Sequence, residues 1–324
     1  MKTVHWKLAA SSVTVAVLLS ACGSSGSGNA ASGTSASAKV ASIKVGVLPL
    51  ADYAPVYWAK DHGFFKKEGL DVTFQTLQGG PVGVQEVATG QLQFSFSNTI
   101  SSSIATSKGA PVQTVALVSG LGVGELGIFV KPNSPIKTLS DLNGKTVGIN
   151  TLNNVGDVSF ANLAKAKGLN AKPSWVEVPF PQMIDGVKNG SIQAGYLPEP
   201  FATAAKDAGL REVAPLVTGP NEALPVSTFV TSTNYAKSDP GTVKKFATAL
   251  NNARADIAKH QKEFRAWMPK ALGTNAKAAK AMNLPNFDVK LSDAAMQKIA
   301  DIMIGLGQVK KGYQASAYTI VNEK

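Results

Sequence analysis

The sequence has few of the residues that build disulfide bonds, metal centres and nucleic-acid interfaces. Its 324 residues include one cysteine and three histidines, and arginine occurs only at Arg211, Arg254 and Arg265. A single cysteine excludes an intramolecular disulfide, and no His/Cys cluster has metal-ligand spacing. Lysine and arginine number 32 against 21 acidic residues, but no arginine-aromatic cluster accompanies this surplus. The positive charge therefore indicates a solvated surface that faces an anionic cell envelope, and no nucleic-acid partner is expected.

The sequence also lacks an apolar run long enough to span a bilayer as a helix. The run Leu8–Leu19 is too short and follows basic residues, an arrangement typical of a secretory signal peptide. Leu19-Ser-Ala-Cys22 resembles a bacterial lipobox, whose cysteine becomes a lipidated amino terminus. We predict a lipoprotein signal peptide over 1–21 and an exported protein anchored through Cys22 to the outer face of the cell membrane. The alternative is a cleaved signal peptide followed by an unmodified cysteine.

The segment 22–41 consists almost entirely of glycine, serine and alanine after Cys22. Because it has no large apolar side chain to bury, we predict a flexible tether. For ~17 residues its root-mean-square reach is on the order of 20–25 Å. The rest of the chain exceeds the size at which one hydrophobic core keeps growing, so two lobes are expected.

The stretch Lys44–Phe74 organises the predicted fold. Its first apolar run ends at Pro49, a helix with Pro55 in its first turn ends at Gly63, and a second strand follows over Leu70–Phe74. This is a β-α-β unit, and open α/β sheets bind ligands at the carboxyl ends of their strands. We therefore predict that the turn after the first strand, with Asp52 and Tyr53, forms one wall of a binding site.

The same alternation of strands and helices continues along the chain. A helix over Val82–Thr89 follows the Gly79-Gly80-Pro81 break. Beyond Asp239-Pro240 the apolar spacing becomes helical. The class is α/β, with further strands predicted at Leu92–Phe96, Val112–Val118, Lys145–Asn150, Trp175–Val178, Gln193–Leu197 and Phe229–Ser232 and long carboxyl-terminal helices at Thr242–His260 and Asp293–Leu306.

Four blocks carry a resemblance to a known family: Tyr53–Val72, Gly90–Asn98, Leu139–Ile149 and Gly190–Phe201. In this order they resemble the NMT1/THI5-like (SsuA/THI5-like) family, which groups substrate-binding proteins of ABC importers for nitrate, sulfonates, taurine and thiamine-pyrimidine precursors. The resemblance covers about residues 42–320. It implies a type II periplasmic-binding-protein fold, in which two α/β lobes are joined by two crossing segments and hold a ligand in the cleft between them.

The resemblance also implies domain boundaries and partners. Lobe 1 comprises 42–127 plus 230–324 and lobe 2 comprises 128–229, with the crossings at the extended segments Leu126–Val130 and Thr228–Thr231. The implied mechanism is hinge closure on a small molecule, followed by docking of a monomer on an ABC permease and its ATPase. No cofactor and no metal are implied.

Candidate ligand contacts lie in the turns at the carboxyl ends of strands. Asp52 can alternatively be a helix cap only, and the same holds for Ser97, Asn98 and Thr99. Glu199 is either a ligand contact or a latch between the lobes. The full candidate set is Asp52, Tyr53, Gly79, Gly80, Ser97, Asn98, Thr99, Glu125, Thr151, Asn153, Asn154, Phe180 and Glu199.

The candidate turns contain no arginine, so an oxyanion such as nitrate or a sulfonate would depend on N–H groups and amides of the turn 151–157. The carboxylates of Asp52, Glu125 and Glu199 instead favour a neutral or amine-bearing ligand, such as a pyrimidine-like ring between Tyr53 and Phe180. Some THI5-like proteins are enzymes that form the thiamine pyrimidine from a pyridoxal cofactor with a cysteine-rich motif. This chain has no cysteine after position 22. We therefore predict a binding protein and not an enzyme, with the oxyanion binder as the alternative.

Overall fold

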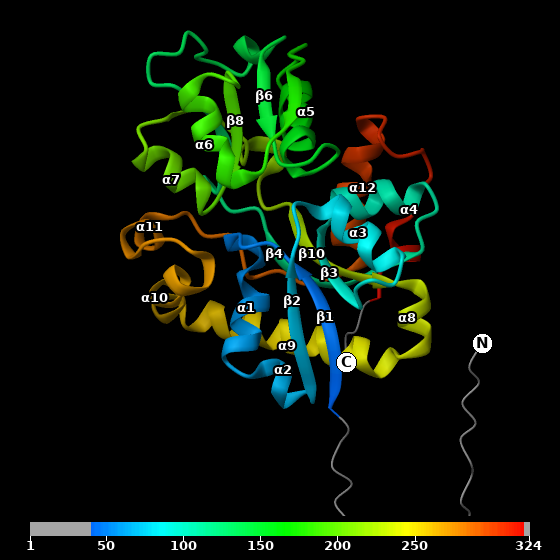
Figure 1. Ribbon diagram of the computed structural model, residues 1–324. Helices are drawn as coiled ribbons and strands as arrows, with labels where there is room; N and C mark the ends of the chain where they lie inside the picture. Colours follow the sequence, from blue (N-terminus) through cyan, green and yellow to red (C-terminus); the bar gives the residue numbers. More distant parts are fainter. Residues whose placement is uncertain (1–39, 321–324) are drawn as a thin grey trace, which may run out of the picture. The chain divides into compact units, whose positions relative to one another are not determined.

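The computed structural model describes residues 40–320, which contain two separate five-stranded sheets (Figure 1). The predicted signal peptide, the predicted lipid anchor at Cys22 and all but the end of the predicted tether lie outside the described residues. The first sheet has the order β2-β1-β3-β10-β4 and the second has the order β7-β6-β8-β5-β9. The strands of the first sheet are β1 (Ala41–Val47), β2 (Leu70–Thr76), β3 (Phe94–Asn98), β4 (Val112–Gly120) and β10 (Pro225–Ser232).

The first sheet is mixed. β1 runs parallel to β2 and β3, whereas β10 runs antiparallel to β3 and β4. All residues of β3 and β10 are buried, which accounts for their nearly continuous apolar or small side chains. Its helices are α1 (Ala54–Asp61), α2 (Phe64–Lys67), α3 (Gly80–Ala88), α4 (Thr99–Ser107), α8 (Thr233–Ser238), α9 (Pro240–Lys259) and α12 (Asp293–Gly305).

Aromatic packing under the first sheet fixes the long helix α9. The ring of Phe246 on α9 stacks on Phe94 of β3 at 3.9 Å and also packs against Phe229 of β10 at 5.6 Å. Phe65 of α2 also stacks on Phe246, at 5.5 Å. Fully buried phenylalanines contribute much of the hydrophobic free energy of a core, so this cluster holds the first sheet to its helical layer.

The second sheet is built from β5 (Leu126–Val130), β6 (Thr146–Ile149), β7 (Ser174–Glu177), β8 (Ala194–Pro198) and β9 (Arg211–Pro215). β6 runs parallel to β7 and β8, and β5 runs antiparallel to β8 and β9. β9 was not predicted, because it is an edge strand with only one fully buried residue. The helices of this sheet are α5 (Val155–Ala166), α6 (Phe180–Asn189) and α7 (Phe201–Asp207), and Figure 1 shows them beside the second sheet.

The chain passes between the sheets at residues 121–125, which join β4 to β5, and at 216–224, which join β9 to β10. The predicted crossing segments Leu126–Val130 and Thr228–Thr231 are corrected here. The first forms β5 of the second sheet, and the second lies inside β10 of the first sheet. Both segments are extended because they are paired strands, and the crossings are the short connections next to them.

The carboxyl-terminal part adds α10 (Gln261–Leu272) and α11 (Ala276–Ala281), which the sequence analysis did not predict. Arg265 donates to the carbonyl oxygens of Ala279 and Met282, and Arg254 donates to that of Phe287. These arginines therefore satisfy backbone carbonyls of this part of the chain. Four short 3-10 helices complete the fold: η1 (Ala51–Tyr53), η2 (Ser140–Leu142), η3 (Gly219–Asn221) and η4 (Ala315–Tyr318).

One predicted helix start is wrong. α3 begins at Gly80 and not after the glycine-proline break, because Pro81 is compatible with the first turn of a helix. A proline also stands at the start of α6, which begins at Phe180 with Pro179 as its N-cap. No helix within residues 40–320 has both the length and the apolar character needed to cross a membrane.

Candidate functional site

A small cavity of about 30 Å³ lies between the two sheets, which is room for about one water molecule. Both sheets contribute to its wall, and the structure brings together most of the predicted contacts there. The predicted residues that line it are Asp52, Tyr53, Gly80, Asn98, Glu125, Asn154 and Phe180. The predicted residues that do not line it are Gly79, Ser97, Thr99, Thr151, Asn153 and Glu199.

The first wall is formed by η1, directly after β1. The hydroxyl of Tyr53 donates to the carbonyl oxygen of Ser97 at 2.5 Å, and its ring packs edge-on against Phe96 at 5.0 Å. These contacts hold the tyrosine ring at the floor of the cavity. Asp52 is the neighbouring residue, and its backbone oxygen accepts from the hydroxyl of Ser119 at 3.1 Å.

The carboxylate of Asp52 is only half satisfied. Its Oδ2 accepts a hydrogen bond from Ser227 Oγ at 2.8 Å, whereas its Oδ1 is buried and has no hydrogen-bond partner among the described residues. Burial raises the pKa of Asp52 to about 6, an effect that the hydrogen bond from Ser227 and the nearby backbone N–H groups of Asp52 and Tyr53 only partly offset. Because an unpaired buried oxygen carries a desolvation penalty, Asp52 is an unusual side chain for a purely structural role.

Glu125 lies in the first crossing and is 2% exposed. Its Oε2 accepts from the backbone N–H of Gly122 at 2.7 Å. Burial raises the pKa of Glu125 well above its usual range, and the negative charges of Asp52 and Glu199 raise it further. The cavity therefore contains two carboxylates that destabilise each other when both are ionised.

The second wall contains aromatic rings on α6 and β8. Phe180 lies 6.0 Å from the ring of Tyr196 and stacks on Phe201 at 5.5 Å. Burial raises the pKa of Tyr196 well above its usual range, and the charges of Asp52 and Glu125 add to this effect. Tyr196 lines the cavity but was not a predicted contact, because it is one residue of an ordinary buried strand.

Paired amides close the cavity on its other side. Asn98 is the N-cap of α4 and accepts from the N–H of Ser101 at 2.8 Å, while its Nδ2 donates to Asn154 Oδ1 at 2.6 Å. Asn154 is the N-cap of α5 and forms a capping box with Asp157. The Nδ2 of Asn154 donates to Thr151 Oγ1 at 2.6 Å. These bonds join the helix N-termini of the two walls directly.

Several predicted contacts support this junction without lining the cavity. A β-carbon added to Gly79 would lie 2.4 Å from Thr151 Oγ1, so only glycine permits this approach. Asn153 has a φ of 55°, and its backbone N–H donates to Asp157 Oδ2 at 2.7 Å. Thr99 Oγ1 donates to the carbonyl oxygen of Pro225 at 3.0 Å.

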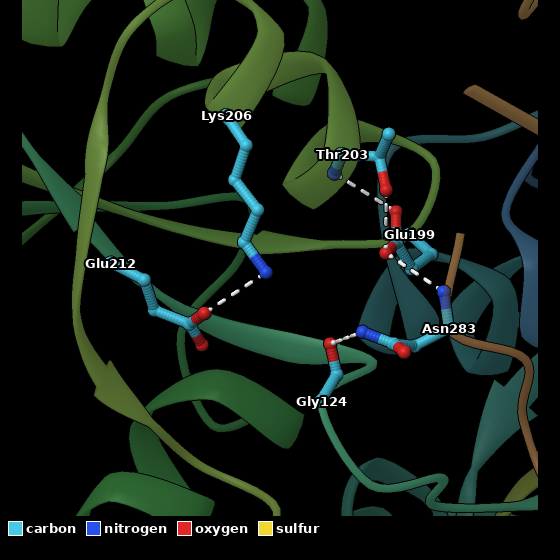
Figure 2. Close-up of polar contacts among 6 residues, drawn as sticks. All are labelled: Gly124, Glu199, Thr203, Lys206, Glu212 and Asn283. Carbon is cyan, nitrogen blue, oxygen red and sulfur yellow. Dashed lines mark hydrogen bonds and ion pairs between the residues drawn. The ribbon is translucent and has the colours of Figure 1, made fainter. Parts of the chain in front are cut away.

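Glu199 connects α7 to the segment after α11 (Figure 2). Its carboxylate accepts from the N–H of Thr203 at 3.0 Å, from Thr203 Oγ1 at 2.9 Å and from the N–H of Asn283 at 3.2 Å. Asn283 Nδ2 donates in turn to the carbonyl oxygen of Gly124 in the first crossing, at 3.0 Å. Burial raises the pKa of Glu199, although these hydrogen bonds and the charge of Lys206 oppose the shift. This arrangement matches the latch alternative.

Within the described part of the chain, the charge of the cavity wall has one sign. Asp52 and Glu125 line the cavity, and no lysine, arginine or histidine does. No group of three or more potential metal ligands occurs in residues 40–320 either. The site as folded therefore offers acceptors and aromatic faces to a ligand, not positive charge.

Comparison with known proteins connects this architecture to a family. A family model described as NMT1/THI5 like matches residues 51–264. The chain is 25% identical over 197 residues to the taurine-binding periplasmic protein of Escherichia coli (strain K12). That alignment covers 60% of this chain and 60% of the relative, so it spans less than two thirds of the relative's length.

Solved structures show the same fold. The alkanesulfonate-binding protein SsuA from Xanthomonas axonopodis pv. citri, bound to MOPS, matches with a TM-score of 0.73 at 18% identity, over 87% of this chain and 99% of that chain. The desulfurization enzyme DSZB matches with a TM-score of 0.63 at 15% identity, over 86% of this chain and 96% of that chain. At such identities the likeness shows the fold alone, which is the type II periplasmic-binding-protein fold.

Proposed function

Because the chain belongs to the NMT1/THI5-like family, we propose that it is the extracytoplasmic substrate-binding component of an ABC importer. The observation that carries the proposal is the cavity between the two sheets, whose wall combines side chains from both and contains an unpaired buried carboxylate oxygen. Polar groups that converge in a concave site between two α/β layers are typical of small-molecule binding sites. The relatives, which are named for binding taurine and alkanesulfonates, support the same class of function.

The proposed mechanism is hinge closure around the ligand. The lobes predicted as 42–127 plus 230–324 and as 128–229 are shifted by a few residues, because β5 belongs to the second sheet and β10 to the first. We propose that the two lobes meet at the crossings 121–125 and 216–224 and turn relative to each other about them. A cavity of about 30 Å³ cannot admit an organic solute, so the lobes must separate before a ligand enters. The closed form then docks as a monomer on the permease, and the permease's ATPase drives transport.

Attachment to the membrane is part of this proposal. Residues 1–21 would be removed as a lipoprotein signal peptide, and Cys22 would carry the lipid at the start of the tether 22–41. A diacylglyceryl group supplies the two chains that stable anchoring needs. Metabolic labelling with a fatty-acid analogue should mark the wild type and not Cys22→Ser. Equal labelling of both proteins would contradict the anchor.

For the ligand, we propose a small polar organic solute, with a pyrimidine-like or amine-bearing compound preferred over an oxyanion. Asp52 and Glu125 supply acceptors, and Tyr53, Tyr196 and Phe180 supply aromatic faces to the same cavity. Nitrate and the sulfonates form the alternative class, in line with the names of the relatives.

An enzyme in the same fold is the second candidate, since a desulfurization enzyme is among the similar structures. His62 does not line the cavity, and its ring stacks on Trp58 at 3.6 Å. We therefore propose no catalytic step. Absorbance near the pyridoxal band, or turnover of an added compound, would favour the enzyme instead.

The test combines the contents of the cleft with closure in solution. Mass spectrometry of protein purified without refolding should detect a bound metabolite. Calorimetric titration with aminopyrimidines, taurine, alkanesulfonates and nitrate should identify a binding class. X-ray scattering should then show a smaller radius of gyration with the bound compound. Scattering that stays the same with every compound would overturn the binding-protein proposal.

A further inference from the structure

We infer that the cavity selects its ligand by positive charge, taking an organic monocation with a planar, N–H-bearing head group that donates to Asp52 Oδ1. This inference rests on the proposed binding function and specifies its substrate class. It depends on three features of the cavity: an unpaired acceptor, the absence of positive charge in the wall, and the prior engagement of the wall's amide donors.

The unpaired acceptor is Asp52 Oδ1. It is buried and has no donor among the described residues, although Oδ2 of the same carboxylate is held by Ser227 at 2.8 Å. Ser227 belongs to β10 and therefore orients the carboxylate from within the first sheet. A ligand N–H placed in the cavity would remove the penalty of the unpaired oxygen, and a cationic N–H would do so most strongly.

The charge of the site reinforces this choice. Glu125 lies near enough for its pKa to be raised by the charge of Asp52, and Glu199 acts on Glu125 in the same direction. Two ionised carboxylates in a buried site repel each other, and a cation between them removes that repulsion. An anionic ligand would increase it. No described lysine, arginine or histidine lines the cavity to compensate.

Part of the donor capacity that an oxyanion would require is already in use. The three asparagines of the wall each donate to a protein oxygen, which engages one of the two N–H groups of each amide: Asn98 to Asn154, Asn154 to Thr151 and Asn150 to the carbonyl oxygen of Gln78.

The caps of α4 and α5 engage backbone donors as well. The backbone N–H of Ser101 donates to Asn98 Oδ1, and that of Val155 donates to Asn154 Oδ1, at 2.8 Å each. Helix N-termini bind anions through free N–H groups, and each of these bonds removes one such group.

The aromatic wall indicates the shape of the head group. Phe180 and Tyr196 line the cavity opposite η1, and aromatic faces attract cations. Because the cavity measures about 30 Å³, a ligand must move apart the side chains that line it. A flat cation separates them less than a globular one with the same number of atoms.

A set of three isosteric probes separates charge from shape. Benzamidinium, benzamide and benzoate have the same flat ring and nearly the same head group, with charges of +1, 0 and −1. We expect calorimetric titration of the full chain near pH 7.5 to give at least tenfold tighter binding for benzamidinium than for benzamide, and the weakest binding for benzoate. Asp52→Asn should remove most of this preference, and Glu125→Gln should reduce it.

Asp71→Asn is the matched control, because Asp71 is exposed on β2 and does not line the cavity. It should leave the order and the ratio of the three affinities unchanged. Circular dichroism of every variant confirms that the fold is intact, and Asn keeps the acceptor that Ser227 needs.

The outcomes also separate this inference from the function on which it rests. Equal binding of the three probes, tighter binding of benzoate, or no binding by any of them would overturn cation selection. If taurine, an alkanesulfonate or nitrate then bound and closed the lobes, the binding-protein proposal would stand and only the inference of cation selection would fall. If no compound bound or changed the scattering, both would fall.

Discussion

The turn after β1 and the turn after β6 occupy corresponding places, each at the carboxyl end of a strand that faces the cavity. They differ in how their polar atoms are paired. In the turn after β6, Asn154 donates to Thr151 and accepts from Val155 and Asn98. In the turn after β1, Asp52 keeps one buried oxygen without a partner. We infer that the turn after β6, the amide side of the cavity, holds the lobes together, whereas the turn after β1, the acidic side, has an acceptor free for a ligand.

The largest effect on ligand affinity is expected at Gly79, where the backbone closely approaches Thr151 on the amide side of the cavity. Gly79→Leu would place a β-carbon 2.4 Å from Thr151 Oγ1, so the walls could not meet as they do here. The φ of Gly79 is −172°, which any residue adopts, so we expect little loss of stability. Affinity for the tightest compound of the titration panel should fall about 100-fold, which is about 2.7 kcal/mol.

Scattering checks the cause of that loss: the radius of gyration of Gly79→Leu should not decrease on ligand addition. Gly241→Ala is the control, because the nearest atom to its added carbon would be 3.7 Å away. Normal affinity in Gly79→Leu would show that the approach to Thr151 is unnecessary for closure.

The next prediction concerns pH on the acidic side. Asp52 has a folded-state pKa of about 6 against an ordinary value of 3.8, so the native state binds its proton more tightly than the unfolded state. Asp52 therefore makes its full contribution to the free energy of unfolding of the ligand-free protein below pH 4, and this contribution is lost as the pH rises through 6. Asp52→Asn should raise the free energy of unfolding by about 2 kcal/mol at pH 7.5, discounted for partial exposure, and by much less at pH 4.

Urea unfolding of the wild type and Asp52→Asn at both pH values measures this difference. Glu199, Tyr53, Tyr196, Asp157 and Lys206 are present in both proteins. Glu125 is also present in both, but the variant relieves it of the charge of Asp52, an effect of the same sign. The difference therefore measures Asp52 together with its repulsion of Glu125. If Asp52→Asn is less stable than the wild type at pH 7.5, the conclusion that the carboxylate of Asp52 is incompletely paired in the wild type is wrong.

In the turn after β6, on the amide side of the cavity, removing a polar side chain should instead lower the free energy of unfolding. Asn154→Ala removes the cap of α5 and the bonds to Asn98 and Thr151. We expect a loss of about 1–2 kcal/mol in the free energy of unfolding, measured in urea. Asn133→Ala is the control, since Asn133 is exposed outside helices and strands. A neutral or stabilising Asn154→Ala would remove the contrast between the two turns.

The smallest effect is expected at the latch around Glu199. Asn283→Ala removes one bond, from Asn283 Nδ2 to the carbonyl oxygen of Gly124, and keeps the backbone bond to Glu199. It should favour the open form by about 1 kcal/mol, seen as a larger radius of gyration of the ligand-free protein. Lys277→Ala, which breaks an ion pair with side chains 82% and 40% exposed, should change it less. Equal effects of the two variants would argue against a latch.

Much of the site was predictable because its parts follow local rules. An apolar strand followed by a polar residue that can cap a helix marks the carboxyl end of a strand, and this pattern located Asp52, Asn98 and Asn154 on the cavity wall. Asn98 and Asn154 do cap α4 and α5, whereas Asp52 lies inside η1 and caps no helix. The predicted crossing segments were misplaced because extended, apolar residues look the same in a connection and in a paired strand. Tyr196 was missed for a similar reason, since a buried strand residue carries no local sign that it faces a cavity.

The sequence by itself determined the α/β class, most of the order of strands and helices, and the acidic and amide character of the turns, because periodicity and capping act over a few residues. Only the tertiary structure decided how those polar atoms are paired. Glu199 accepts from Asn283, which lies 84 residues away, and Asn98 donates to Asn154, which lies 56 residues away. Long-range packing alone determines which acceptor is left without a donor, and so why Asp52, and not Asn154, is available to a ligand.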